Sequence, residues 1–160
     1  VFAGPLADDL RLARPQATDD ELRVALDQVG ALDWAQALPD GLATVVGDGA
    51  HRLTVTQAQQ LALARLILAD PPIAILDEAT AEAGSAGARV LEAAAVRALS
   101  GRTGLVVAHR LTQAATADRV VVLEAGQVVE TGTHAELVAA AGRYAALWEA
   151  WSDTRRYPDG

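Results

Sequence analysis

Two consecutive prolines, Pro71 and Pro72, separate a helix-forming stretch from a short apolar run, and this feature constrains the fold most. The stretch Ala58 to Ala69 is rich in leucine and alanine, which favour helix, and its apolar positions form a face broad enough for burial. The prolines end this helix because they lack an N–H and push the preceding residue toward extended geometry. The run Ile73 to Leu76 is too short for a helix and is typical of a strand covered on both faces in a parallel sheet.

Two acidic residues, Asp77 and Glu78, directly follow the predicted strand. In open α/β sheets the carboxyl ends of the strands form the ligand crevice, so the position of these acids matters more than their type. Taken alone, the run Ile73 to Leu76 with the two acids that follow it also fits an ordinary buried strand that ends in two solvated acidic residues. The predicted helix, in turn, has an N-terminus that is free to meet an anion. It follows a five-residue segment: Leu53, Thr54, Val55, Thr56 and Gln57.

Together these segments resemble the signature motif, the Walker B strand and the catalytic glutamate of ATP-binding cassette (ABC) ATPases. The five-residue segment resembles the signature, and Leu63-Ala64-Arg65, Asp70-Pro71 and the run Ile75 to Thr80 follow at matching spacing. The resemblance implies an α/β fold, namely a P-loop NTPase-like (RecA-like) core fragment with a mostly parallel sheet plus an ABC helical subdomain. It divides the chain into the helical subdomain and signature helix (1–69), the Walker B to C-terminal part of the ATPase core (70–151) and a flexible tail (152–160).

The resemblance also implies roles for individual residues in ATP hydrolysis. Asp77 would orient Mg²⁺ through a coordinated water, and Glu78 would polarise the attacking water as general base. His109 follows a second predicted buried strand, Gly104 to Ala108, and resembles the switch histidine that contacts the γ-phosphate. A lone histidine at a strand end is otherwise most often a satisfied or exposed residue. The family's D-loop corresponds to Ala81, Glu82, Ala83 and Gly84, where glycine replaces the usual aspartate.

The signature departs from the family's Leu-Ser-Gly-Gly-Gln. Val55 and Thr56 stand where glycines allow close approach of the backbone to phosphate, and Ala58 and Gln60 replace arginines that often follow. In this family two domains bind two ATP molecules head to tail, and each signature acts on the opposite subunit. We therefore expect a second ABC nucleotide-binding domain as partner, in a homodimer or a heterodimer. The degenerate signature favours an asymmetric pair.

All 13 basic residues are arginines, so the phosphate-binding motif G-x-x-x-x-G-K-[ST] is absent from this sequence. ATP and Mg²⁺ binding would therefore need residues that the chain does not carry. We expect it to be the C-terminal part of a longer domain, without Walker A and the Q-loop, and to be inactive in isolation. The 21 acidic residues give a net charge of −8, which argues against nucleic acid as a direct partner.

Several local patterns predict further elements. Capping boxes, in which a Thr and a Glu three residues later satisfy each other's backbone N–H, are predicted at Thr18 and Thr133. Two strands, Arg119 to Glu124 and Gln127 to Glu130, form a predicted hairpin. Trp34 is expected to anchor the core.

The segment Thr44 to Gly49 resembles the exporter X-loop, which implies contact with a transmembrane domain. A glycine-rich connection with no partner is the alternative for this segment. The resemblance implies that the chain lies at the cytoplasmic face of the cell membrane, as part of a membrane transporter. We also expect residues 152–160, which are polar and contain a proline, to be frayed.

Three functions fit these observations. The first is part of an ABC ATPase that couples ATP hydrolysis to export of an unknown substrate across a membrane. The second is a non-transport ABC ATPase of the chromosome-maintenance or repair type, which the exporter-like Gly47-Asp48-Gly49 and Gly132-Thr133-His134 disfavour. The third is a non-catalytic regulatory half, against which the presence of both Glu78 and His109 argues.

Overall fold

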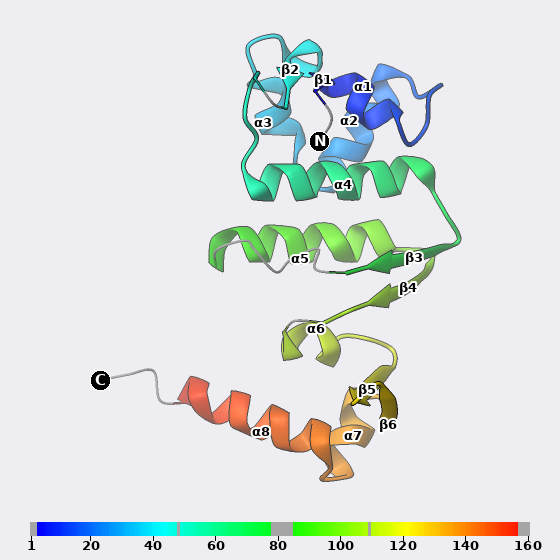
Figure 1. The fold of residues 1–160 in the computed structure, drawn as a ribbon, viewed down its shortest axis with the longest axis vertical. Coiled ribbons are helices and arrows are strands. Elements are labelled where there is room, and N and C mark those ends of the chain that lie inside the picture. The colour runs from blue at the N-terminus through cyan, green and yellow to red at the C-terminus, as the bar shows by residue number, and fades with distance from the viewer. Residues whose placement is uncertain (1–2, 48, 78–84, 109, 157–160) are drawn as a thin grey trace. The chain divides into compact units, whose positions relative to one another are not determined.

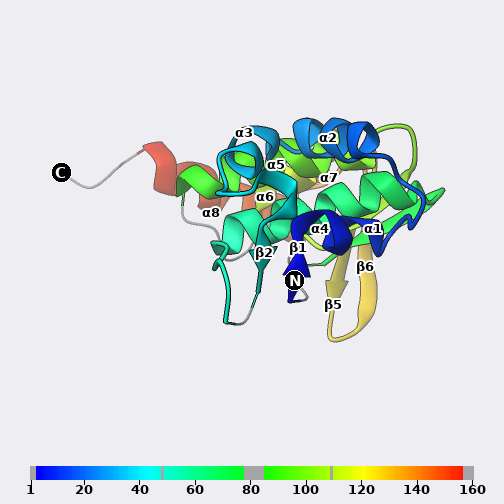
Figure 2. The same cartoon turned by 90° about the horizontal axis from the view of Figure 1, so that it is seen from above.

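The structure is a computed structural model that describes residues 3–47, 49–77, 85–108 and 110–156. The chain divides into two compact units, Val1–Val107 and Ala108–Gly160 (Figures 1 and 2). The first unit contains, in chain order, β1 (Gly4–Pro5), α1 (Leu6–Arg11), α2 (Asp19–Gln28), α3 (Leu32–Gln36), the 3₁₀ helix η1 (Gly41–Ala43), β2 (Val45–Val46), α4 (Val55–Ala69), β3 (Ile73–Leu76), α5 (Ser85–Leu99) and β4 (Thr103–Val106). The second contains α6 (Leu111–Ala115), β5 (Val120–Glu124), β6 (Gln127–Gly132), α7 (His134–Ala139) and α8 (Arg143–Arg156).

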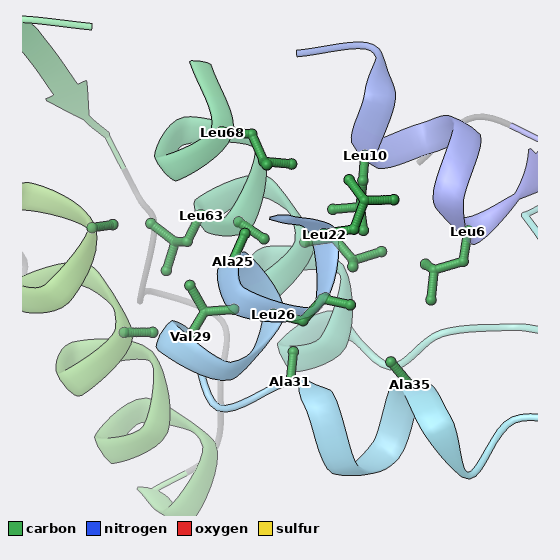
Figure 3. Packing of buried hydrophobic residues seen from close by; sticks show 14 of the residues in the cluster. Leu6, Leu10, Leu22, Ala25, Leu26, Val29, Ala31, Ala35, Leu63 and Leu68 are labelled. Carbon is green, nitrogen blue, oxygen red and sulfur yellow. The ribbon is translucent and has the colours of Figure 1, made fainter. Parts of the chain in front are cut away.

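The core of the first unit is built where α1, α2 and α4 pack together. Leucines on one side of each helix point into the same space (Figure 3): Leu6, Leu10, Leu22, Leu26, Leu63 and Leu68. The core extends to α5 through Leu91 and Ala94, which are buried. Helix α4 therefore lies between the other helices. Its predicted end at Ala69 is confirmed, and Asp70 follows in the left-handed conformation with φ 44°.

Both predicted capping boxes are confirmed. At the start of α2 the Glu21 N–H donates to the Thr18 hydroxyl at 3.3 Å, and the Thr18 N–H donates to the Glu21 carboxylate at 2.8 Å. Thr133 and Glu136 repeat this arrangement at the start of α7, at 3.3 and 2.8 Å. Each box satisfies two of the N–H groups that a helix leaves without an internal acceptor.

These boxes predict a pH dependence of stability. The backbone N–H of Thr18, and then its hydroxyl, lower the pKa of Glu21 from 4.5, and Thr133 does the same to Glu136. A pKa that is lower in the folded state stabilises the fold above the unfolded-state value, and this stabilisation is lost as the pH falls through the folded-state value. We expect an E21Q/E136Q variant, which keeps an acceptor but cannot titrate, to lose stability less steeply below about pH 4.5. Urea unfolding between about pH 6 and pH 3 measures this slope.

Glu149→Gln, at an exposed carboxylate on α8, is the matched control and should keep the acid slope of the parent chain. If E21Q/E136Q and the parent lose stability equally between pH 6 and pH 3, the boxes do not titrate as inferred.

Strands β3 and β4 form a parallel pair, with Ile73 opposite Thr103 and Leu76 opposite Val106. The expectation that both strands are buried on both faces is wrong for the described structure. Along β3, Ala74 and Leu76 are buried, while Ile73 and Ile75 are 64% and 67% exposed, and all of β4 is exposed. The reason is that Leu76 joins the helical core on one face of the pair, while the described residues leave the other face exposed.

The mixed α/β class is confirmed, but the described residues do not form the expected mostly parallel sheet. They contain three two-stranded sheets, of which β1–β2 and β5–β6 are antiparallel. The predicted hairpin is confirmed as β5–β6. Its two turn residues, Ala125 and Gly126, both have positive φ, as a two-residue turn of type I′ requires.

The second unit packs α7 and α8 beside the hairpin. The Glu130 carboxylate on β6 accepts the N–H groups of Arg143 and Tyr144 at 2.7 and 2.9 Å, which satisfies the start of α8. His134 lies against Tyr144 and Trp148, and its Nδ1 is 2.8 Å from the Tyr144 hydroxyl. Helix α8 continues to Arg156, so residues 152–156 are helical where the sequence suggests a frayed tail. Within the described ranges, no helix has the length and apolar character needed to cross a membrane.

Candidate functional site

The segment that resembles the signature forms the first turn of α4. Thr54 is the N-cap, and the helix begins at Val55, three residues before the predicted stretch Ala58 to Ala69. The Gln57 N–H donates to the Thr54 hydroxyl at 3.2 Å, and the Thr54 N–H donates to the Gln57 side-chain oxygen at 2.9 Å. This is a third capping box. It was not among the predicted boxes, although Thr-x-x-Gln has the same spacing as the boxes at Thr18 and Thr133.

The capping box determines which donors this turn can offer to an anion. Two backbone N–H groups, of Thr54 and Gln57, are already paired. Those of Val55 and Thr56 have no carbonyl of the preceding helical turn to bond, because the helix starts at Val55. The Val55 side chain is 48% exposed beside them. The turn can therefore meet an anion through two N–H groups and the positive end of a 15-residue helix.

Gln60, one turn further along α4, is a buried polar residue with 3% exposure. Its Nε2 donates to the carbonyls of Val29 and Gly30, both at 2.9 Å. Its Oε1 accepts from the indole Nε1 of Trp34 at 3.1 Å. Trp34 is therefore half-buried and hydrogen-bonded, which refines the expectation that it is a core anchor. In the sequence Gln60 stands out only as a departure from the family's arginine, and no local pattern indicates its burial.

Asp77 is exposed at the end of β3, on the rim of an open hollow of about 360 Å³. The hollow lies between α4 and β3 and is lined by Gln59, Ala62, Leu63, Leu66, Ile75, Leu76 and Asp77. No group of three or more His, Cys, Asp or Glu side chains gathers into a metal site among the residues that the structure describes. A single carboxylate fits Mg²⁺, which keeps several waters and commonly takes one or two protein carboxylates together with phosphate oxygens.

The ends of β3 and β4 lie side by side at one edge of the sheet. Leu76 pairs with Val106, and the Val107 N–H donates to the Leu76 carbonyl at 2.9 Å. Asp77 therefore leaves the sheet at the edge where β4 also ends. The predicted catalytic residues Glu78 and His109, and the D-loop residues Ala81, Glu82, Ala83 and Gly84, lie outside the described residues.

Ion pairs and hydrogen bonds hold the later turns of α4. Arg65 reaches Asp9 of α1, with 2.7 Å between Nη1 and Oδ2, and the Asp9 side chain is 1% exposed. At the C-terminus of α4, Arg102 donates to the Leu66 carbonyl at 3.2 Å and to the Asp70 carboxylate at 2.9 Å. A cation at this end opposes the negative end of the helix dipole. These contacts and those of Gln60 fix α4 along its length.

The segment Thr44 to Gly49 is folded against the first unit at one end and exposed further along. Thr44 is buried, and its hydroxyl accepts from the Asp40 N–H at 3.0 Å. Val46 is fully buried in β2, whereas Val45 is 50% exposed. Gly47 and Gly49 have φ of 106° and 80°, a conformation that favours glycine. Asp48 lies outside the described residues.

Comparison with curated proteins gives relatives over almost the whole chain. It is 47% identical over 148 residues to ATP-dependent lipid A-core flippase of Thiobacillus denitrificans, a match covering 92% of this chain and 26% of that protein. It is 46% identical over 150 residues to Multidrug efflux ATP-binding/permease protein of Mycobacterium bovis, covering 94% of the chain and 13% of that protein.

A third relative is Mitochondrial potassium channel ATP-binding subunit of Xenopus tropicalis, 42% identical over 147 residues, which cover 92% of the chain and 21% of that protein. The chain thus spans about a quarter or less of the length of these relatives. No protein-family model matches it.

Proposed function

Because the chain belongs to the exporter-type nucleotide-binding domains of ABC transporters, we propose that it is the C-terminal part of a domain that binds and hydrolyses ATP to drive export. The observation that carries this proposal is the parallel pair β3–β4, whose two strands end at one edge beside Asp77 and α4. The carboxyl ends of parallel strands are where α/β proteins bind ligands. The motif order along the sequence supports the same assignment.

In this proposal three residues act on one phosphate. Asp77 would hold Mg²⁺ through a coordinated water, and its exposed position at the end of β3 supports this role. Glu78 accepts a proton from the attacking water as general base. His109 donates a hydrogen bond to the γ-phosphate and so stabilises the charge that develops there. Bound Mg²⁺ supplies charge neutralisation of the phosphates. The phosphate-binding loop comes from another segment, since the chain contains no lysine.

The signature turn acts in trans in this proposal. The turn from Leu53 to Gln57 presents the N–H groups of Val55 and Thr56 to the nucleotide of a second ABC nucleotide-binding domain. The exposed Val55 side chain and the β-branched Thr56 limit how closely a phosphate can approach. This degenerate signature would weaken the partner's site, so we propose an asymmetric dimer. The D-loop from Ala81 to Gly84, with glycine in place of aspartate, fits the same asymmetry.

Two of the relatives favour export over the other ABC functions, because their names describe a flippase and a multidrug efflux permease. We propose that the segment from Thr44 to Gly49 contacts a transmembrane domain at the cytoplasmic face of the membrane. Its exposed Val45 and two positive-φ glycines support a contact surface there. The net charge of −8 argues against the chromosome-maintenance alternative, since a nucleic-acid partner would need basic surface. The exported substrate is not specified by these residues.

The degenerate signature predicts a gain of function. In the longer polypeptide, purified with its membrane part and its partner, Val55→Gly with Thr56→Gly should raise the ATP hydrolysis rate about tenfold. Without these side chains the phosphate can come closer to the backbone N–H donors, which then stabilise its charge more strongly. Steady-state release of inorganic phosphate measures the rate. Ala58→Gly is the matched control, since it adds a glycine to the same helix beyond the signature.

Two outcomes separate the parts of the proposal. If the parent is active and the double-glycine variant hydrolyses ATP at the same rate, the idea of a degenerate signature is wrong but the ATPase assignment is unaffected. Absence of hydrolysis in the parent and in every variant would count against the ATPase itself. A rate increase in Ala58→Gly of the same size would mean that loosening the helix, rather than closer phosphate approach, causes the gain.

A further inference from the structure

The end of α2 is held by side chains from two other helices. Gln60 of α4 donates to the carbonyls of Val29 and Gly30, and Arg97 of α5 donates to the Gln28 carbonyl at 3.2 Å. These carbonyls belong to the last turn of α2 and the residues after it, where a helix leaves its acceptors without internal donors. Gly30, at φ 66°, turns the chain here. The two contacts are therefore similar in kind, but they originate from different helices.

Gln60 differs from Arg97 because it lies on the helix that begins with the signature turn. Its side chain is 3% exposed, and both of its amide protons are used. Its oxygen accepts from Trp34 of α3, so one side chain connects α4 to both α2 and α3. The side-chain hydrogen bonds of the signature turn itself are local, between Thr54 and Gln57. Apolar packing alone tolerates small slides and rotations, whereas hydrogen bonds have narrow limits of distance and angle.

We propose that Gln60 is a positioning residue for the signature turn. It fixes the rotation and height of the first turns of α4 against α2 and α3, so that the Val55 and Thr56 N–H groups approach the partner's nucleotide in one orientation. This inference rests on the proposed function, because it assigns Gln60 a role in the same trans site. Gln60 acts through the backbone of α4 and does not touch the nucleotide.

The test is Gln60→Met in the longer polypeptide assembled with its partner, because methionine keeps the length of the side chain but makes none of the three hydrogen bonds. At the partner's ATP site, which is the one that this signature turn completes, we expect kcat to fall between about 10- and 100-fold, the cost of a small misplacement of a group in a reacting complex. The KM for ATP should stay within about twofold, because the phosphate-binding loop, which lies outside this chain, holds the phosphates of ATP, and the signature turn adds contacts from the other domain. Arg97→Met is the matched control, because it also removes a side-chain donor to a carbonyl at the end of α2. It should leave kcat within about twofold, because Arg97 lies on α5 and not on the helix that begins with the signature turn.

The outcomes are distinct from those of the proposed function. Wild-type kcat in Gln60→Met, in a polypeptide whose parent hydrolyses ATP, would overturn the inference and leave the ATPase assignment intact. An equal loss in Arg97→Met would overturn it too, since general loosening of α2 would then explain the effect. If Gln60→Met does not fold, Trp34→Phe decides. It removes the donor to Gln60 Oε1, keeps a smaller aromatic ring, and should lower kcat a few-fold at constant KM. Wild-type kcat in a folded Trp34→Phe would overturn the inference.

Discussion

Replacing Glu78 by glutamine in the longer polypeptide is expected to lower the rate of ATP hydrolysis at least about 100-fold while ATP still binds, because a positioned general base contributes that much or more. Glutamine keeps the shape of the side chain but cannot accept the proton of the attacking water. Since ATP then remains intact between two domains, the variant should also accumulate as an ATP-bound dimer. Phosphate release measures the first effect, and gel filtration with ATP measures the second.

Glu149→Gln is the matched control, because it makes the same chemical change at an exposed carboxylate of α8. It should leave both the rate and the dimer unchanged. A Glu78→Gln dimer that still dissociates in ATP would contradict the proposed trans site. The isolated 160-residue chain provides a second control, because without a phosphate-binding lysine it should not hydrolyse ATP. Activity of the isolated chain that is lost on Glu78→Gln would contradict the dependence on another segment.

The elements that depend on neighbouring residues could be predicted from the sequence. The boxes at Thr18 and Thr133, the end of α4 before Pro71 and the turn at Ala125-Gly126 each follow from backbone chemistry within a few positions. The faces of β3 could not be predicted in this way. An apolar run such as Ile73 to Leu76 indicates that a strand can be buried, but which face is covered depends on segments far away in the sequence.

In the candidate site, too, contacts between residues close in the sequence could be predicted and contacts between distant residues could not. The Thr54–Gln57 box is present in the sequence as a three-residue spacing and could have been recognised. Gln60 could not, because its partners Val29 and Gly30 lie about 30 positions earlier. They become neighbours only when α2 packs on α4. Gln57 and Gln59 stand close to Gln60 in the same helix, so nothing in the local sequence marks Gln60 as the glutamine that is buried. Glu78 and His109 remain predictions from motif order.

Replacing Arg65 by methionine is expected to destabilise the first unit by about 3 kcal/mol, close to the lower end of what breaking a buried ion pair costs. Methionine keeps an apolar side chain at this position of α4 but removes the guanidinium 2.7 Å from Asp9. The effect is large because the Asp9 side chain is 1% exposed, so water cannot replace the lost partner, whereas Arg65 itself is 25% exposed. Urea unfolding of the chain, followed by far-ultraviolet circular dichroism, measures the change.

The matched control is Arg23→Met, which breaks the pair between Arg23 and Asp20 at the surface of α2. Their side chains are 46% and 93% exposed, so this loss should cost less than about 1 kcal/mol. Adding Asp9→Asn to Arg65→Met should recover part of the stability, because it removes the buried charge and keeps a hydrogen-bonding group. If Arg65→Met lowers the free energy of unfolding no more than Arg23→Met does, the burial of Asp9 does not make its ion pair more stabilising than one at the surface. The connection from α1 to α4 would then depend on the leucine core alone.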